Sequence, residues 1–130
     1  MRVLLDTHTF FWAVRDPSRI PAVATELVTD SGNELLVSAV TPWEMGIKVR
    51  SGRFPEAAPF LAAMPRYLGA LGASELPITI EHSLVAGQLE WPHRDPFDRM
   101  LAAQAIIENA VLVSADTVFS TLGGLRLSWR

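Results

Sequence analysis

Four acidic residues could form a metal site if folding brought their carboxylates together: Asp6, Glu44, Asp98 and Asp116. Clustered carboxylates repel, and one pair about 4 Å apart costs about 4 kcal/mol at an effective dielectric of 20. Such a cluster is compatible with neutral pH only if its pKa values are raised or a cation is bound. The chain has no cysteine and no convincing histidine spacing, so oxygen ligation of Mg²⁺ or Mn²⁺ is favoured.

Carboxylates that hold one or two divalent ions beside a phosphodiester are the apparatus of metal-dependent nucleases. The ion lowers the pKa of a water molecule, orients the phosphate and stabilises the leaving oxyanion. The sequence has no persuasive serine–histidine arrangement, which agrees with a reaction that needs no covalent nucleophile.

Two of these acids follow predicted strands. Asp6 comes directly after the apolar run Val3–Leu5, and Asp116 lies two residues beyond the run Val111–Ser114. Short apolar runs of this kind are typical of buried strands. Parallel α/β sheets bind ligands beyond the carboxyl ends of their strands, so both acids are expected to point into one crevice.

The other two acids stand in matching segments, Thr41-Pro42-Trp43-Glu44 and Asp95-Pro96-Phe97-Asp98. Each segment has a potential N-cap, a proline at the first helical position, an aromatic residue and an acid in the first turn. Local structure alone explains such acids, because Thr41 with Glu44 forms a capping box and the helix dipole favours an acid there. If both helices start at the functional edge of the sheet, however, these acids converge on the first pair.

The predicted elements alternate between strand and helix along the chain. Strands are expected at 3–5, 35–38, 76–80, 111–114 and 125–128, and helices at 10–14, 21–29, 41–50, 57–71, 81–89, 95–109 and 118–122. Pro59 and Pro65 are expected to kink or divide one helical stretch. The alternation predicts an α/β fold, with a mostly parallel central sheet flanked by helices, in one domain over residues 1–130.

Composition narrows the class of protein. Of the 130 residues, 49% are hydrophobic and 19% are charged, which excludes intrinsic disorder. Eleven basic against fourteen acidic side chains give a net charge of −3, so nucleic acid can be bound only locally or through metal ions. No signal peptide or long apolar segment occurs, which predicts a soluble, cytoplasmic protein that does not enter the membrane.

Four segments occur in an informative order: Val3–Thr7, Thr41–Glu44, Asp95–Ala105 and Leu112–Asp116. Together they resemble the PIN-domain (PilT N-terminal) family, and more specifically the VapC ribonuclease toxins of bacterial type II toxin–antitoxin systems. Each motif alone is weak, whereas the ordered set is specific and covers nearly the whole chain.

The resemblance implies site residues. By position, Asp6, Glu44, Asp98 and Asp116 fall on the family's acidic quartet, as catalytic residues and as ligands of Mg²⁺ or Mn²⁺. The residues after Asp98 identify it as the third acid, which leaves Asp95 as a helix cap. Asp116 completes or supports the site.

The resemblance also implies an activity and partners. The expected protein is a PIN-like endoribonuclease in which metal-activated water attacks the phosphorus in line and leaves 5′-phosphate and 3′-hydroxyl ends. Its substrate is expected to be single-stranded or loop RNA. A homodimer is implied, as is inhibition by a cognate antitoxin that packs over the active-site groove. The RNA target, the antitoxin, the dimer surface and the number of metal ions are left open.

Residues near the acids allow alternative interpretations. Thr7 is either a helix N-cap or a group that holds a metal-bound water. Arg94 and Arg99 could contact RNA phosphates, although surface solubility explains them at least as well. Trp43 could stack on a base, but packing against the adjacent strand is favoured. No metal-binding spacing is made by the three histidines, His8, His82 and His93.

Two other functions fit parts of the pattern. In a non-catalytic PIN-like binding module, the acids would only cap helices, and divalent ions would not raise the melting temperature. In a phosphatase-like α/β enzyme, Asp6 would be a covalent nucleophile. That chemistry requires a second aspartate two residues later, where the chain has His8.

Overall fold

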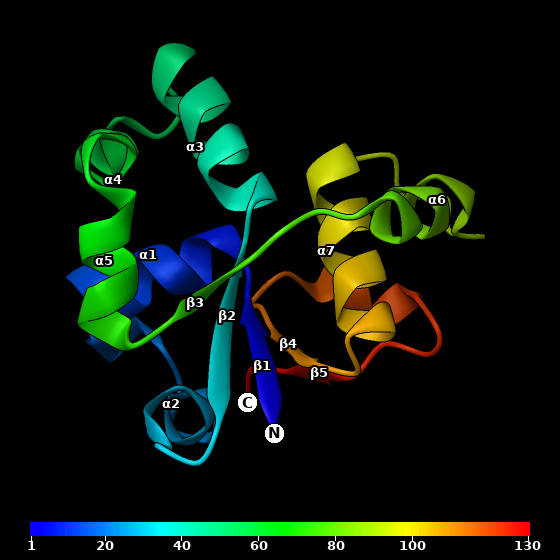
Figure 1. The fold of residues 1–130 in the computed structure, drawn as a ribbon, viewed down its shortest axis with the longest axis horizontal. Helices are drawn as coiled ribbons and strands as arrows, with labels where there is room; N and C mark the ends of the chain where they lie inside the picture. Colours follow the sequence, from blue (N-terminus) through cyan, green and yellow to red (C-terminus); the bar gives the residue numbers. More distant parts are fainter.

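Five parallel strands form the central sheet in the computed structural model, which describes residues 1–130 (Figure 1). The strands are β1 (Arg2–Leu5), β2 (Glu34–Ser38), β3 (Ser74–Leu76), β4 (Val111–Val113) and β5 (Leu127–Ser128). Their spatial order is β3-β2-β1-β4-β5, and every neighbouring pair is parallel. The predicted α/β class is confirmed, and the sheet is parallel throughout.

Seven α-helices connect or follow the strands. They are α1 (Thr7–Arg15), α2 (Ala22–Thr29), α3 (Val40–Arg50), α4 (Ala58–Ala62), α5 (Met64–Leu71), α6 (Ile80–Gln88) and α7 (Pro96–Ile107). Three short 3₁₀ segments cover Pro17–Arg19, Pro55–Ala57 and Thr117–Thr121. None of the helices combines the length and the apolarity that a bilayer crossing requires.

The sheet is covered on both faces. Val3 and Leu5 of β1 pack into one hydrophobic cluster, which includes side chains of α1 and α4. Leu4 points to the opposite face, into a second cluster that includes side chains of α7. All three side chains are fully buried. Because successive residues of a strand point to opposite faces, a continuous apolar run such as Val3–Leu5 requires helices on both sides, as Figure 1 shows.

The strand order creates a crevice at the carboxyl edge of the sheet. From the central strand β1 the chain builds β2 and β3 on one side, and it later returns to build β4 and β5 on the other. The reversal places a topological switch point between β1 and β4, where open α/β sheets bind ligands. Asp6 follows β1 and Asp116 lies just beyond β4, so both stand at this crevice.

Several predicted boundaries are wrong: α1 covers Thr7–Arg15 rather than 10–14, and β5 covers Leu127–Ser128 rather than 125–128. Two further differences have identifiable reasons. Strand β3 covers Ser74–Leu76 rather than 76–80, because Pro77 has no N–H and Thr79 already caps α6. The capping box of Thr41 and Glu44 does not form, because α3 begins one residue earlier, at Val40.

The expected division of the 57–71 stretch is confirmed. Helix α4 ends at Ala62, and α5 starts at Met64 after a non-helical Ala63. Pro65 then occupies the first turn of α5, where a missing N–H leaves no helical hydrogen bond unmade.

Candidate active site

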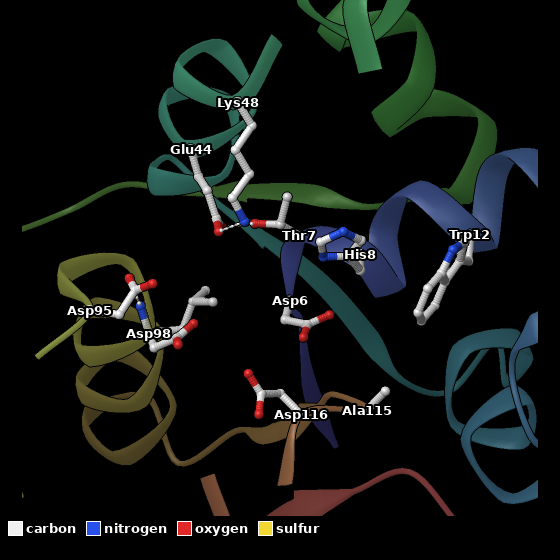
Figure 2. Close-up of a pocket in the computed structure, with 11 residues that line it drawn as sticks. Asp6, Thr7, His8, Trp12, Glu44, Lys48, Asp95, Asp98, Ala115 and Asp116 are labelled. Atoms are coloured by element: carbon white, nitrogen blue, oxygen red, sulfur yellow. Dashed lines mark hydrogen bonds and ion pairs between the residues drawn. The ribbon is translucent and has the colours of Figure 1, made fainter. Parts of the chain in front are cut away.

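An acidic pocket of about 400 Å³ lies at the carboxyl edge of the sheet (Figure 2). Five carboxylates line it: Asp6, Glu44, Asp95, Asp98 and Asp116. Lys48 is the only lysine or arginine among the lining residues. Folding therefore brings all four acids of the sequence motifs to one cavity, while their roles in catalysis and metal binding remain predictions.

Asp6 is held by hydrogen bonds to both of its carboxylate oxygens. It is the N-cap of α1, where Oδ1 accepts from the backbone N–H of Thr9 at 2.8 Å. The hydroxyl of Ser114 donates to Oδ2. Burial raises the pKa of Asp6, and the hydrogen bonds from Ser114 and Thr9 oppose that shift only in part. A negative charge on Asp6 is therefore destabilised unless a cation lies nearby.

Glu44 is a buried carboxylate in the second turn of α3, with 5% of the residue exposed. Its Oε1 accepts from the hydroxyl of Thr7 at 2.5 Å, and its Oε2 lies 2.7 Å from Nζ of Lys48. Thr7 is therefore not the helix cap, a role that Asp6 takes, but a donor that fixes Glu44. Sequence reasoning did not assign Lys48 to the site, although its spacing of four residues from Glu44 is a helical ion-pair signal.

Asp98 lies in the first turn of α7, opposite Glu44 across the pocket in Figure 2. Nε2 of His93 lies 2.7 Å from its Oδ2. Burial raises the pKa of Asp98 to about 6, against the hydrogen bond from His93, which lowers it. Asp95 caps α7 as predicted, because its Oδ1 accepts from the backbone N–H of Phe97 at 2.8 Å.

The structure overturns the expectation that His93 has no metal-binding spacing. One ligand atom from each of His93, Asp95 and Asp98 lies within 4.8 Å of the others. The three residues are close in sequence, so the signal was present in the order His-x-Asp-x-x-Asp. What the sequence did not show is the turn before α7 that points the imidazole toward Asp98.

Asp116 is an exposed residue on the wall formed by the segment after β4. Its Oδ1 caps the following 3₁₀ segment by accepting from the N–H of Val118 at 3.0 Å. Its own N–H donates to the hydroxyl of Ser114 at 3.1 Å. The buried Ser114 hydroxyl thus connects the carboxylate of Asp6 to the backbone of Asp116, beyond the carboxyl ends of the paired strands β1 and β4.

The donor set fits a hard divalent cation. All five carboxylates are oxygen donors, and neither cysteine nor methionine is among the lining residues. One lysine offsets only part of their charge, and burial disfavours the ionised forms of Asp6 and Asp98. A cation of charge two would relieve that destabilisation.

Arg99 does not line the pocket but binds the segment between α6 and α7, next to it. Its guanidinium donates to the backbone carbonyls of Ala86 (2.9 Å), Leu89 (2.8 Å), Trp91 (2.8 Å) and His93 (3.0 Å). Neither interpretation offered from the sequence, a phosphate contact or surface solubility, describes this role. The side chain fixes the segment between α6 and α7 that carries His93.

Arg99→Met is expected to lower the free energy of unfolding by about 2–4 kcal/mol, because backbone carbonyls that accept from a charged donor lose it together. Urea denaturation measures the change. Arg94→Met is the matched control, since Arg94 is exposed and is expected to change the free energy by about 0.5 kcal/mol at most. Equal effects of the two substitutions would contradict the supporting role of Arg99.

Asp98→Asn is expected to stabilise the metal-free protein above pH 6. The folded-state pKa of Asp98, about 6, lies above its unfolded value, so its stabilising contribution is complete below the unfolded pKa and is lost as pH rises through 6. Asparagine stays neutral, and its gain near pH 8 is on the order of 1–3 kcal/mol, from about 1.4 kcal/mol per unit of pKa. Urea unfolding in EDTA near pH 8 and near pH 4 measures it; no gain near pH 8 would contradict the prediction.

Trp43 lies outside the pocket lining, next to Glu44. The residue is 60% exposed, and its ring meets that of Phe97 edge to face at 5.0 Å. The favoured prediction that Trp43 packs against the adjacent strand is wrong, because the helix starts early and turns this side chain toward α7.

Comparisons with known proteins agree with the fold and the motifs. The sequence model of the family described as PIN domain matches residues 3–125. Ribonuclease VapC22 of Mycobacterium tuberculosis is 27% identical over 114 residues, which are 88% of this chain and 86% of that protein.

Solved structures share the fold. VapBC2 from Rickettsia felis, bound to a DNA fragment from its promoter, has a TM-score of 0.73 at 20% identity and covers 100% of both chains. DNA-bound VapBC from Salmonella typhimurium has a TM-score of 0.71 at 18% identity, with 98% of this chain and 97% of that chain covered. VapBC-5 from Mycobacterium tuberculosis, a member of the VapBC family of toxin-antitoxin systems, has a TM-score of 0.60 at 18% identity, with 99% and 98% covered.

Proposed function

Because this chain belongs to the PIN domain family, we propose that it is a metal-dependent endoribonuclease and the toxin of a type II toxin–antitoxin pair. Ribonuclease activity is the named activity of the Mycobacterium tuberculosis relative, which aligns over 88% of this chain. The observation that carries the proposal is the shared pocket of four motif acids at the carboxyl edge of a parallel sheet.

In this proposal the divalent ion is Mg²⁺ or Mn²⁺, held by Asp6, Glu44, Asp98 and Asp116. Such an ion, when bound, lowers the pKa of water and offsets the charge of the phosphate. The donor set of the pocket supports this assignment, because it is made of oxygen ligands whose charge is only partly balanced.

The residues around the acids keep the carboxylates in place. Ser114 and the N–H of Thr9 fix Asp6, and Thr7 fixes Glu44. Lys48 places an ammonium group among the acids, which reduces the repulsion that a phosphodiester meets on entering the pocket.

The proposal includes the partners and the location of the protein. Single-stranded or loop RNA is the substrate, and a cognate antitoxin is the inhibitor. Support for the antitoxin comes from the fold shared with VapBC-5, a member of a family of toxin-antitoxin systems. We further propose that the protein is a homodimer and that it is located in the cytoplasm. Residues 1–130 form a single PIN-like domain in this proposal.

The chemistry of the products tests the proposed reaction. Purified protein with Mg²⁺ or Mn²⁺ is expected to cut single-stranded RNA into fragments with 5′-phosphate and 3′-hydroxyl ends, because water rather than the ribose 2′-hydroxyl attacks the phosphorus. Mass spectrometry of the fragments identifies the ends. Fragments with 2′,3′-cyclic phosphate ends would show attack by the ribose and would exclude the mechanism.

A further inference from the structure

The pocket has an aromatic end to which the proposed function assigns no role. Trp12 and His8 line the same cavity as the acids. In Figure 2 they lie on one side of Asp6, whereas Glu44 and Asp98 lie on the other. The pocket therefore runs from an acidic end, past Asp6, to an aromatic end.

The two aromatic rings form one supported wall. His8 and Trp12 are four residues apart on α1, so they share one face of the helix, and their ring centroids are 5.6 Å apart. Phe54 stacks against His8 at 4.9 Å with an interplanar angle of 15°. Trp129 contacts Trp12 at 5.8 Å. The wall is thus held in place from outside the pocket, while His8 is exposed and Trp12 half-buried.

A cation lies over one face of the Trp12 ring, outside the pocket lining. The guanidinium carbon of Arg19 is 5.2 Å from the ring centroid of Trp12, and Arg19 is exposed. This surface therefore combines an acidic cluster, an aromatic wall and, against Trp12 of that wall, a positive charge. A nucleic-acid strand presents a complementary series of phosphate, base and next phosphate.

We propose that His8 and Trp12 form a base-binding subsite, on which a base adjacent to the scissile phosphate stacks, with Arg19 near the backbone of the same strand. This inference rests on the proposed nuclease function and specifies its substrate. A base can stack on this wall only if it is unpaired, so the subsite selects single-stranded RNA.

Abasic RNAs test the subsite. A single-stranded RNA with one cleavage site is compared with copies that lack one base at each position near that site. On the intact RNA, Trp12→Leu is expected to lower kcat/KM about 5- to 150-fold, the range that corresponds to stacking of one base. At one abasic position, kcat/KM of the wild type is expected to fall by the same factor, because the base that stacks on Trp12 is missing. At that position the kcat/KM of Trp12→Leu is expected to equal its value on the intact RNA. Trp12→Phe keeps an aromatic face and is expected to retain most of the activity.

Two controls separate stacking from a structural effect. Trp43→Leu removes an exposed tryptophan outside the pocket lining and is expected to leave kcat/KM within about twofold. An equal loss for Trp12→Leu on every abasic RNA would show that Trp12 only supports the fold, and would overturn the proposal. Weakened antitoxin binding with unchanged RNA kinetics would overturn it too, because the wall would then be a protein contact.

A binding measurement does not depend on cleavage. Calorimetry with Mg²⁺ compares adenosine 5′-monophosphate with ribose 5-phosphate, which lacks the base. The wild type is expected to bind the nucleotide about 5- to 150-fold more tightly, and Trp12→Leu is expected to remove the difference. Equal affinities in the wild type overturn the subsite. If the protein binds the nucleotide more tightly than ribose 5-phosphate but cuts no RNA, the proposed nuclease function is rejected and the base-binding subsite is retained.

Discussion

Asp6→Asn is expected to lower RNA cleavage by about 10³-fold or more while the fold stays intact. Asparagine is as good an N-cap as aspartate, so its Oδ1 can still accept from the N–H of Thr9. What is lost is a negative charge where the divalent ion is proposed to bind. Stabilisation by such an ion is worth several kcal/mol, and about 4 kcal/mol corresponds to about 10³-fold in rate. Measuring kcat/KM on single-stranded RNA tests the expectation.

Asp30→Asn is the matched control for this substitution. Asp30 is exposed, lies outside the acidic pocket and, like Asp6, accepts a hydrogen bond from a backbone N–H, that of Gly32 at 2.8 Å. It is expected to leave kcat/KM within about twofold. A folded Asp6→Asn variant that keeps wild-type cleavage would remove the acid cluster from the mechanism.

Removal of divalent ions is expected to abolish cleavage and to lower the melting temperature. An ion that binds only the folded protein stabilises it by about 2.7 kcal/mol at a concentration one hundred times its Kd. For a chain of this length that corresponds to roughly 5–10 °C. Thermal melting with Mg²⁺, with Mn²⁺ and with EDTA measures the shift, and gel assays under the same conditions measure cleavage.

A variant that lacks two of the four proposed ligands separates binding at the site from a general salt effect. The double substitution Asp6→Asn with Asp98→Asn is expected to melt at the same temperature with and without Mg²⁺ at constant ionic strength. The non-catalytic binding module, by contrast, predicts no shift for the wild type either. Cleavage that persists in EDTA would contradict the metal-dependent reaction.

The three central strands β1, β2 and β4 and the common location of the motif acids were the predictable part of this molecule. The run Val3–Leu5 is buried on both faces of the sheet, so its apolar character is continuous and visible in the sequence. Asp6 and Asp116 follow from the rule that ligands bind at the carboxyl ends of parallel strands. The start of α3 was not predictable in this way, because the Thr41 side chain is buried 3.5 Å from the hydroxyl of Thr7 instead of capping its own helix.

The supporting residues were predictable only where their partners are local. The pair of Lys48 and Glu44 has a helical spacing that can be found in the sequence. Arg99 donates to backbone carbonyls of the segment 86–93. Every residue has such a carbonyl, so the sequence does not indicate which of them an arginine will bind. His93 meets Asp98 because of the turn between α6 and α7, which Arg99 itself holds in place.

The single lysine of the chain gives the pocket a chemical label of its own. Lys48 is the only lysine among the 130 residues, so an acylating reagent selective for amines modifies one side chain, inside the cavity. While that amine is bound to Glu44 its reaction is slowed. The rate of acetylation therefore reports, in one mass-spectrometric peak, whether another cation has displaced it.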